Sequence, residues 1–175
     1  MALHVEATIV QGAWLRHVPA GVDPGQRPQP PGDNRWQRGA VIDAVYLADS
    51  EACAWAEWCR RLAEAAVPPG FAMPRDLWRY EVAPREVADL SDPARLAGVG
   101  LPQPEPGRPS WPAFQAVGER LHDEGWRGLL APSAARPASK ILAVFLSEST
   151  TPVELVAVGC TRVAAAPAPP TGLRT

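Results

Sequence analysis

The chain has 175 residues, of which 46% are hydrophobic, which suffices for the core of one domain but would be cramped as two. Its formal net charge of −2 provides no electrostatic basis for direct binding to nucleic acid or to an anionic membrane. Three cysteines without a Cys-x-x-Cys pair argue against a secreted disulfide framework, and no leader-like or membrane-spanning apolar run is present. We therefore expect a soluble, cytoplasmic protein.

The first half of the chain predicts two strands and a helix. β-Branched and aromatic residues over Glu6–Arg16 indicate a strand, and the apolar run Ala40–Ala48 indicates a buried one. The pair Asp49–Ser50 offers an N-cap for an alanine-rich helix that extends to Ala66. The Pro-Pro-Gly sequence that begins at Pro68 ends this helix.

The second half predicts more strands and one further helix. Alternation over Asp76–Ala83 indicates a strand, and Ser110 could cap a helix whose apolar residues recur at helical spacing until Gly125. Three closing strands are predicted at Trp126–Ala131, Lys140–Leu146 and Pro152–Val163. Two main helices with six or seven strands, without regular βαβ alternation, predict an α+β domain.

Prolines and glycines divide the chain but reveal no second domain. We expect a single domain over residues 1–163 and a flexible, Pro- and Ala-rich C-terminal tail over 164–175. Neither a glycine-rich phosphate loop nor a common catalytic-serine motif is present. The three histidines are isolated from one another in the sequence, so we expect no metal site.

Glu57 is the first residue that suggests chemistry, because it lies between Trp55 and Trp58 in the predicted helix. One interpretation is an ordinary exposed helix face, on which Glu57 pairs with Arg61 four residues later. The other is a cleft lined by aromatic residues, in which the carboxylate holds a sugar hydroxyl or stabilises a developing cation. The local sequence leaves both open.

Three further residues have a functional interpretation beside an ordinary one. Arg35 could stack on its neighbouring tryptophan at the surface, or present its planar fork to a phosphate. Tyr46, near the end of a buried strand, could be a core residue or could offer its face to a flat heterocycle. Ser133 follows an apolar strand and is by default a turn serine.

Taken in order, these segments resemble the RES-domain family, which is named for an arginine, a glutamate and a serine. The matching stretches are "NRWQRG", "AVYLADSEACAWAEW", "FQAVGERLHDEGWRGLLAPSAA" and "ILAVFL". The likeness extends from Trp14 to Val163, which is nearly the whole chain. It implies a fold related to the diphtheria-toxin-like ADP-ribosyltransferases, with a compact, mostly antiparallel sheet and flanking helices.

The resemblance also implies an activity and a partner. Members of the family are toxins of bacterial toxin–antitoxin pairs that destroy NAD+ by phosphorolysis or hydrolysis of its nicotinamide–ribose bond. NAD+ would be a substrate, inorganic phosphate a possible co-substrate, and no prosthetic group is implied. The implied protein partner is a helix-turn-helix antitoxin that blocks the active-site cleft.

By the same resemblance, three residues are implied to be catalytic. Arg35 would contact phosphate groups, and Tyr46 would lie against the nicotinamide or the neighbouring ribose. Glu57 would hydrogen-bond the nicotinamide ribose and favour its oxocarbenium-like transition state. Nicotinamide is a cationic leaving group, so positioning and one negative charge can supply much of the catalysis.

Three more residues are implied to bind the substrate. Ser133 would help to seat the ligand, and Trp36 belongs to the arginine–tryptophan segment of the family. Arg16 falls where family members often carry an early arginine in the cleft.

Two other functions remain open at this level. A protein ADP-ribosyltransferase would use the same cleft with a protein side chain as the acceptor. A catalytically weakened relative would bind a nucleotide or a partner protein without releasing nicotinamide.

Overall fold

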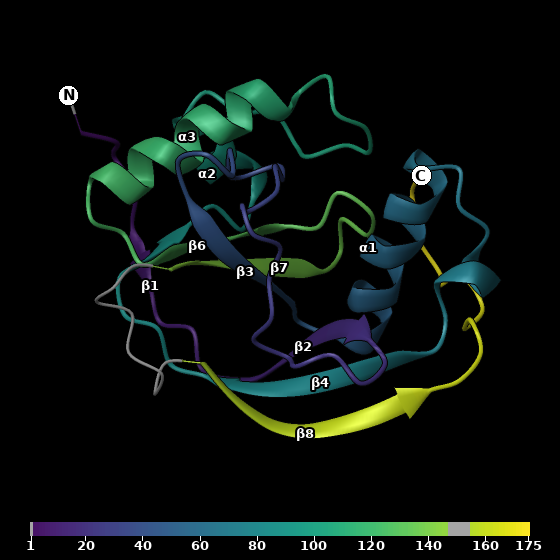
Figure 1. Cartoon of the computed structure of the whole chain (residues 1–175). Helices are drawn as coiled ribbons and strands as arrows, with labels where there is room; N and C mark the ends of the chain where they lie inside the picture. The colour runs from purple at the N-terminus through teal and green to yellow at the C-terminus, as the bar shows by residue number, and fades with distance from the viewer. Residues whose placement is uncertain (1, 147–154) are drawn as a thin grey trace.

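The computed structural model describes residues 2–146 and 155–175, in which one eight-stranded sheet is accompanied by three α-helices and a short 3-10 helix (Figure 1). The strands are β1 (Ala7–Thr8), β2 (Gly12–Pro19), β3 (Asp43–Ala48), β4 (Arg75–Val82), β5 (Val87–Asp89), β6 (Gly128–Pro132), β7 (Lys140–Leu146) and β8 (Leu155–Val163). The helices are α1 (Glu51–Glu64), η1 (Pro69–Ala72), α2 (Pro93–Gly98) and α3 (Trp111–Asp123).

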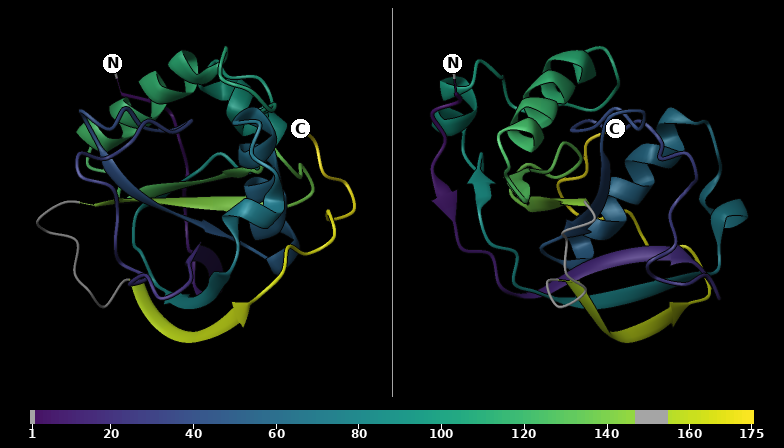
Figure 2. Two further views of the ribbon diagram at one scale, coloured as in Figure 1. Left: turned by 45° about the vertical axis from the view of Figure 1, so that its right-hand side comes forward. Right: turned by 60° about the vertical axis from the view of Figure 1, so that its left-hand side comes forward.

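The sheet is mostly antiparallel, which confirms the predicted α+β class. Its strand order is β1-β5-β6-β7-β3-β2-β4-β8, and among these neighbours only β5 and β6 are parallel. Figure 2 shows β2, β4 and β8 together on one side of the molecule and α3 on the opposite side. The sheet thus bends strongly between its two halves.

The strand predicted over Glu6–Arg16 is two strands in the structure. β1 pairs with β5, whereas β2 pairs with β3 and β4, so the two segments belong to distant parts of the sheet. Gly12 begins β2 with a φ of +89°, a conformation that L side chains rarely adopt. Residues 9–11 separate the two strands, and Gly12 marks the point at which β2 begins.

Two short elements escaped the sequence analysis. The three residues of β5 and the six of α2 are too few to show a period, and no element was predicted between Ala83 and Ser110. α2 is stabilised locally because the Asp92 carboxylate accepts hydrogen bonds from the amides of Ala94 and Arg95. The first three residues predicted for the last strand lie outside the described residues.

The helix caps are partly as expected. Ser50 caps α1, since its hydroxyl accepts a hydrogen bond from the Cys53 amide at 3.2 Å. Ser110 precedes α3 as predicted but makes no capping hydrogen bond. Its hydroxyl instead accepts a hydrogen bond from Arg35 at 3.1 Å.

Strand β3 is buried on both faces, and several of its residues line the cavity described below. Val45 and Leu47 pack into one hydrophobic cluster, with residues of β2 and β4. Ala44 and Ala48 pack into the other cluster, with aromatic residues of α1 and α3. Because side chains alternate along a strand, a strand covered on both faces reads as a continuous apolar run.

Helix α3 holds the segment from Asn34 to Gln37 in place. The Gln115 amide donates hydrogen bonds to the Asn34 carbonyl at 2.9 Å and to the Gln37 carbonyl at 3.2 Å. Gly118 allows the close approach, because a Cβ built there would lie 2.1 Å from the Trp36 carbonyl oxygen. A larger residue at this position would push the segment away from the helix.

Asp76 on β4 binds both strand β8 and the turn after β2. The resulting shift in its pKa predicts that the stability of the protein depends on pH. Its carboxylate accepts hydrogen bonds from Arg162 at 2.8 Å and 2.9 Å and from the Gly21 amide at 2.7 Å. The Arg162 hydrogen bonds, followed by that from Gly21, lower the pKa of Asp76 to about 2. Because the folded-state pKa is depressed, this stabilisation is present above the unfolded value of about 3.9 and is lost as the pH falls toward the folded one.

We therefore expect Asp76→Asn to have a lower melting temperature than wild type at neutral pH. In acid, where wild type loses this stabilisation, the difference in melting temperature between the two proteins should become smaller. Thermal unfolding followed by circular dichroism across this acidic range measures both. A difference between variant and wild type that stays constant down to the folded pKa of Asp76 would contradict this account.

Candidate active site

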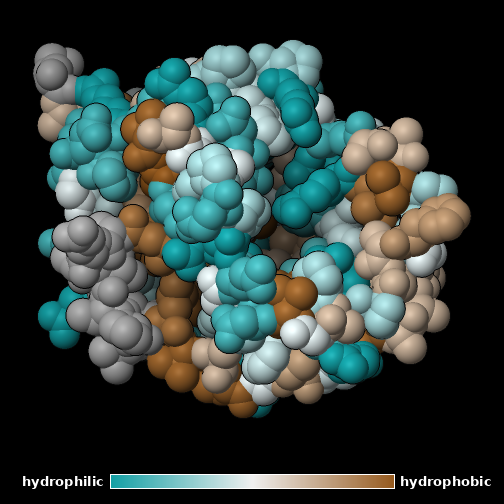
Figure 3. Space-filling view, in the orientation of Figure 1, coloured by the Kyte–Doolittle hydropathy of each residue, from teal (hydrophilic) through white to brown (hydrophobic). Residues whose placement is uncertain are grey.

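A cavity of about 660 Å³ opens between α1, β2, β3 and two long loops. Figure 3 shows that the molecule is hollowed on this face, among residues that are largely hydrophilic. A volume of this size falls within the range of about 300–1,000 Å³ that is usual for small-molecule sites. The cavity is therefore large enough for a nucleotide-sized ligand.

The cavity wall is unusually rich in charged groups, with cations in excess. Among the described residues, the lining includes seven arginines and four acids: Arg16, Arg27, Arg35, Arg60, Arg61, Arg75, Arg108, Asp33, Asp43, Glu57 and Glu64. A concave wall with an excess of one sign concentrates its field on the space that it encloses. This wall therefore favours a ligand that carries negative charge.

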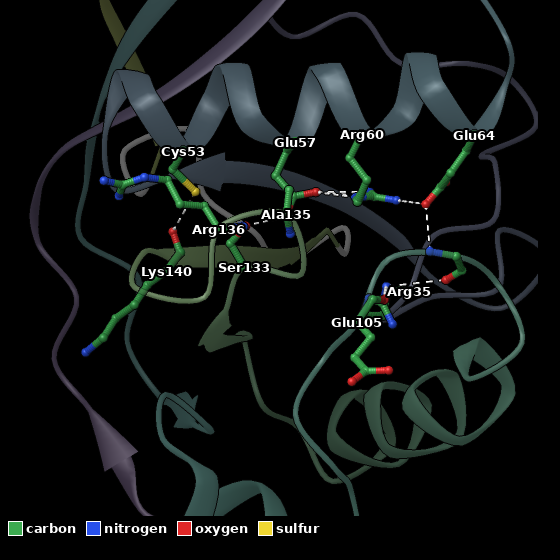
Figure 4. Close-up of polar contacts among 11 residues, drawn as sticks. Arg35, Cys53, Glu57, Arg60, Glu64, Glu105, Ser133, Ala135, Arg136 and Lys140 are labelled. Atoms are coloured by element: carbon green, nitrogen blue, oxygen red, sulfur yellow. Dashed lines mark hydrogen bonds and ion pairs between the residues drawn. The ribbon is translucent and has the colours of Figure 1, made fainter. Parts of the chain in front are cut away.

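Glu57 lies at the centre of the polar contacts in the cavity (Figure 4). Its helix buries Trp55 and Trp58 in the core, which leaves Glu57 half-buried on the cavity side. Oε1 accepts hydrogen bonds from the Ser133 hydroxyl at 2.6 Å and from the Ala135 amide at 3.3 Å. Oε2 accepts two from Arg60, at 3.0 Å and 3.1 Å, so both oxygens of the carboxylate are held.

The surroundings of Glu57 differ from the exposed helix face that one sequence-based interpretation assumed, and its role in catalysis stays a prediction. The expected pairing on an exposed helix face was with Arg61, four residues later. Glu57 pairs instead with Arg60, which is itself buried, and the Arg61 guanidinium makes no hydrogen bond or ion pair with any described residue. The carboxylate thus lies in a cavity, and Arg61 contributes an unpaired cation to the same wall.

Ser133 contacts Glu57 directly and is fully buried, with 0% of its surface exposed. It lies just after β6, where the Arg136 amide donates a hydrogen bond to its hydroxyl at 3.0 Å. The hydroxyl therefore accepts from the loop and donates to the carboxylate, which fixes its direction. In this position Ser133 orients Glu57, and a direct contact with ligand, as predicted for it, would require the loop to move.

The C-terminal segment lies against the loop that holds Glu57. The Arg174 amide donates a hydrogen bond to the Ala135 carbonyl at 2.7 Å, and Arg136 Nε donates to the Thr171 carbonyl at 3.1 Å. Ala135 therefore binds Glu57 through its amide and the C-terminal segment through its carbonyl. The division into a domain and a flexible tail at residue 163 stays a prediction, but the conformation described for residues 171–174 supports the site.

A second network connects Glu57 to the loop before α3. Arg60 binds Glu64 as well as Glu57, and Glu64 accepts a hydrogen bond from the Gly107 amide at 2.9 Å. Burial raises the pKa of Glu64, but the Gly107 and Arg60 hydrogen bonds outweigh it, so the net pKa of Glu64 is lowered. Arg60 was not predicted as a site residue, although it lies three residues from Glu57, a spacing at which helical side chains can meet.

Arg35 holds the same loop from the opposite side. Its guanidinium donates hydrogen bonds to the Glu105 carbonyl, to the Gly107 carbonyl at 3.5 Å and to the Ser110 hydroxyl at 3.1 Å. It also lies 5.2 Å above the centre of the Phe114 ring. Burial lowers the pKa of Arg35, with a further contribution from Arg60. The three hydrogen bonds of the Arg35 guanidinium are all to groups of the protein itself. Its contact with phosphate therefore stays a prediction.

Tyr46 and Trp36 differ in what they offer to the cavity. The Tyr46 hydroxyl is buried and makes no normal hydrogen bond with a described residue, and burial raises the pKa of Tyr46 well above its usual value. Tyr46 therefore presents a neutral phenol with an unused donor at the cavity wall. Trp36 borders the cavity too, but it is only 1% exposed and packs edge-on against Phe114, with ring centres 5.0 Å apart. The ring of Trp36 is thus part of the hydrophobic core.

A neutral histidine joins β2 to α1 and β4. The His17 ring stacks on Trp55 with centres 5.2 Å apart, and its Nδ1 accepts a hydrogen bond from Arg75 Nε at 2.8 Å. Burial, followed by the charge of Arg75, lowers the pKa of His17 to about 3. Neither His17 nor Arg75 was predicted as a site residue, because they meet only through the register of β2 with β4.

We expect Ser133→Ala to lower kcat for the reaction proposed below by about tenfold, the equivalent of one hydrogen bond to a charged group, with little change in KM. The reason is that Ser133 contacts Glu57 and does not line the cavity, so in the proposed reaction it would act on the substrate through Glu57. Ser139→Ala is the matched control, because Ser139 is buried in the same loop and does not contact Glu57. Equal kinetics for the Ser133 variant and wild type would show that the hydroxyl does not position Glu57.

Two comparisons with known proteins extend these observations. The RES domain family matches residues 10–162. The chain belongs to the RES domain family. It is also 29% identical, over 136 residues, to a Mycobacterium tuberculosis protein named "Probable NAD(+) phosphorylase Rv3189". The aligned region spans 78% of this chain and 62% of that relative, so the chain covers less than two thirds of the relative's length.

The fold of this RES domain also matches a solved structure. A chain of the M. tuberculosis MbcT–MbcA toxin–antitoxin complex superimposes with a TM-score of 0.77 and 23% sequence identity, over 90% of this chain and 87% of that one. At this identity the match shows the fold, and it confirms the architecture expected from the sequence.

In the described residues, no group of three or more histidine, cysteine or acidic side chains could hold a metal ion. No helix of the described part is long and apolar enough to span a bilayer.

Proposed function

We propose that this RES domain protein consumes NAD+ by cleaving its nicotinamide–ribose bond, as an NAD+ phosphorylase or, with water as the acceptor, a glycohydrolase. The observation that carries the proposal is the Glu57 carboxylate, held by Ser133, Ala135 and Arg60 inside an arginine-lined cavity. Family membership and the 29% identity to a relative named as an NAD(+) phosphorylase support it.

The charges of the cavity suit this reaction. As the bond between nicotinamide and the ribose carbon breaks, nicotinamide leaves as a neutral base with the bonding electron pair, and positive charge develops on the ribose. A fixed carboxylate beside the ribose stabilises that charge, and a preorganised one needs little rearrangement in the transition state. A phosphate oxygen then bonds to the ribose carbon to form ADP-ribose 1-phosphate. Water would give ADP-ribose and release a proton.

We further propose that the protein acts as the toxin of a toxin–antitoxin pair. The fold match to a chain of a toxin–antitoxin complex supports an antitoxin partner. A helix-turn-helix protein that covers the cavity is the partner expected from the family resemblance. Such a partner should inhibit nicotinamide release when it is added to the purified enzyme.

The test is nicotinamide release from NAD+ by the purified full chain, with and without inorganic phosphate. Release that requires phosphate identifies a phosphorylase, and release without it identifies a glycohydrolase. Transfer of labelled ADP-ribose to a protein would replace the proposal with a protein ADP-ribosyltransferase. NAD+ binding without release by well-folded protein would leave only the binding function.

A further inference from the structure

Three arginines carried by the helix and strands of the cavity wall make no ion pair with an acid among the described residues: Arg16 on β2, Arg61 on α1 and Arg75 on β4. Arg16 Nη1 donates to the Pro24 carbonyl at 3.3 Å, and Arg75 Nε donates to His17 at 2.8 Å. The Arg61 guanidinium makes no hydrogen bond or ion pair in the described part of the chain. Most of the donors on these guanidinium groups are therefore available to a ligand.

All three arginines line the cavity, and His17 of β2 connects the elements that carry two of them. His17 accepts the hydrogen bond from Arg75 and stacks on Trp55 of the helix that carries Arg61. Arg16 precedes His17, so its side chain leaves β2 on the other face of the strand. Their charges affect one another. The pKa of Arg75 is lowered to about 10 by burial and then by Arg61. The pKa of Arg16 is lowered mainly by burial, with smaller contributions from Arg27 and then Arg61.

We propose that Arg61, together with Arg16 and Arg75, forms an oxyanion subsite that takes a phosphoryl group. The proposal rests on the function proposed above, and it leaves two sources for that group: the diphosphate of the nucleotide and inorganic phosphate. Guanidinium groups match phosphate oxygens in both charge and hydrogen-bond geometry. Neighbouring cations repel one another, and a bound oxyanion relieves that repulsion.

The other arginines of the wall are less suited to this role. Arg27 pairs with Asp43 at 2.8 Å, and Arg60 pairs with both Glu57 and Glu64. Arg35, the arginine expected from the sequence to contact phosphate, already binds two carbonyls and a hydroxyl of the protein. Arg108 makes no ion pair with a described residue either, but its guanidinium lies over the Trp111 ring, 5.2 Å from the ring centre. We therefore place the subsite at Arg61 and not at the loop beside Arg35 and Arg108.

The position of Arg61 relative to Glu57 places the subsite next to the proposed catalytic carboxylate. Residues four apart on a helix have Cβ atoms about 5–6 Å from each other, so Arg61 follows Glu57 on the same side of α1. An oxyanion bound by Arg61 would lie close to the carboxylate that supports cleavage. A diphosphate there would orient the ribose, whereas inorganic phosphate there would be ready to attack it.

The experiment is a calorimetric titration of ADP-ribose, and separately of inorganic phosphate, into Arg61→Met, Arg75→Met and wild type at fixed ionic strength. We expect at least one of the two ligands to bind about tenfold more weakly to each variant, the loss of one charged hydrogen bond. Weaker binding of ADP-ribose assigns the nucleotide diphosphate to the subsite, and weaker binding of phosphate assigns inorganic phosphate. Arg79→Met is the matched control, because Arg79 is an exposed arginine of β4 that does not line the cavity.

Unchanged affinity for both ligands in folded Arg61→Met and Arg75→Met would overturn the subsite. So would wild type that binds neither ligand, or an equal loss of affinity in the Arg79→Met control. Because the readout is binding, this result is separate from catalysis. Wild type that binds ADP-ribose through Arg61 but releases no nicotinamide would overturn the proposed function and support the subsite.

Discussion

Glu57→Gln is expected to reduce nicotinamide release by about 10²–10³-fold, the range found when one preorganised electrostatic group is removed from an active site. The substitution takes away the negative charge that would face the ribose in the proposed reaction. It also replaces one carboxylate oxygen with an NH2 group, which would face donors from either Ser133 or Arg60. The loss should therefore appear mainly in kcat, measured by steady-state nicotinamide release.

Glu51→Gln provides the matched control for this variant. Glu51 lies in the first turn of the same helix, outside the cavity lining, and accepts a hydrogen bond from the Trp55 indole at 3.1 Å. An amide oxygen can still accept that bond, so we expect kinetics close to wild type. If Glu57→Gln retained wild-type turnover, or if both variants lost activity equally, Glu57 would not be the group that supports cleavage.

Arg60→Met is expected to lower both stability and turnover. Arg60 is 9% exposed and joins two carboxylates, so its loss leaves Glu57 and Glu64 without their cation. Breaking a fully buried pair costs about 3–5 kcal/mol, but both acids keep some access to water, and we expect about 2 kcal/mol. For a chain of this size that corresponds to a melting temperature lower by about 4–8 °C.

The effect on turnover separates positioning from stability. Arg60→Lys keeps the charge without the planar fork, so it should recover part of the stability and part of kcat. Arg120→Met is the control, since Arg120 pairs with Glu124 four residues later on an exposed helix face and such pairs contribute about 0.3–0.5 kcal/mol. Differential scanning calorimetry and nicotinamide release at a temperature where every variant is folded provide the two measurements. If Arg60→Met melted and turned over like the Arg120 variant, the Glu57–Arg60–Glu64 network would have no positioning role.

The sequence was sufficient for those elements whose signals are local. Helix α1 follows from the Ser50 cap and the apolar spacing behind it, because a helix makes its hydrogen bonds within a few residues. Strand β3 follows from a continuous apolar run, and its position in the middle of the sheet explains the run. Elements of three to six residues, such as β5 and α2, contain too few side chains to show a period.

In the candidate site, too, the sequence indicated individual residues, whereas the contacts between them follow from the tertiary structure. The local sequence marked Glu57 as an acid among aromatic residues, and the order of the motifs marked Ser133. That Ser133 holds Glu57 follows only from the structure, because the two residues are 76 positions apart and meet where the loop after β6 reaches α1. The choice of Arg60 over Arg61 as the partner of Glu57 is also tertiary, since the two spacings are equally available on an isolated helix.

The sequence by itself therefore determined the class of fold, the main elements and the acid at the centre of the site. The tertiary structure decided which charges are paired and which are free: Arg60 is bound between two acids, Arg35 holds a loop, and Arg61 faces the cavity without a partner. The physical reason is that helices and apolar runs depend on neighbours in the chain. Ion pairs depend on strand register and loop packing, which bring together residues that no local pattern connects.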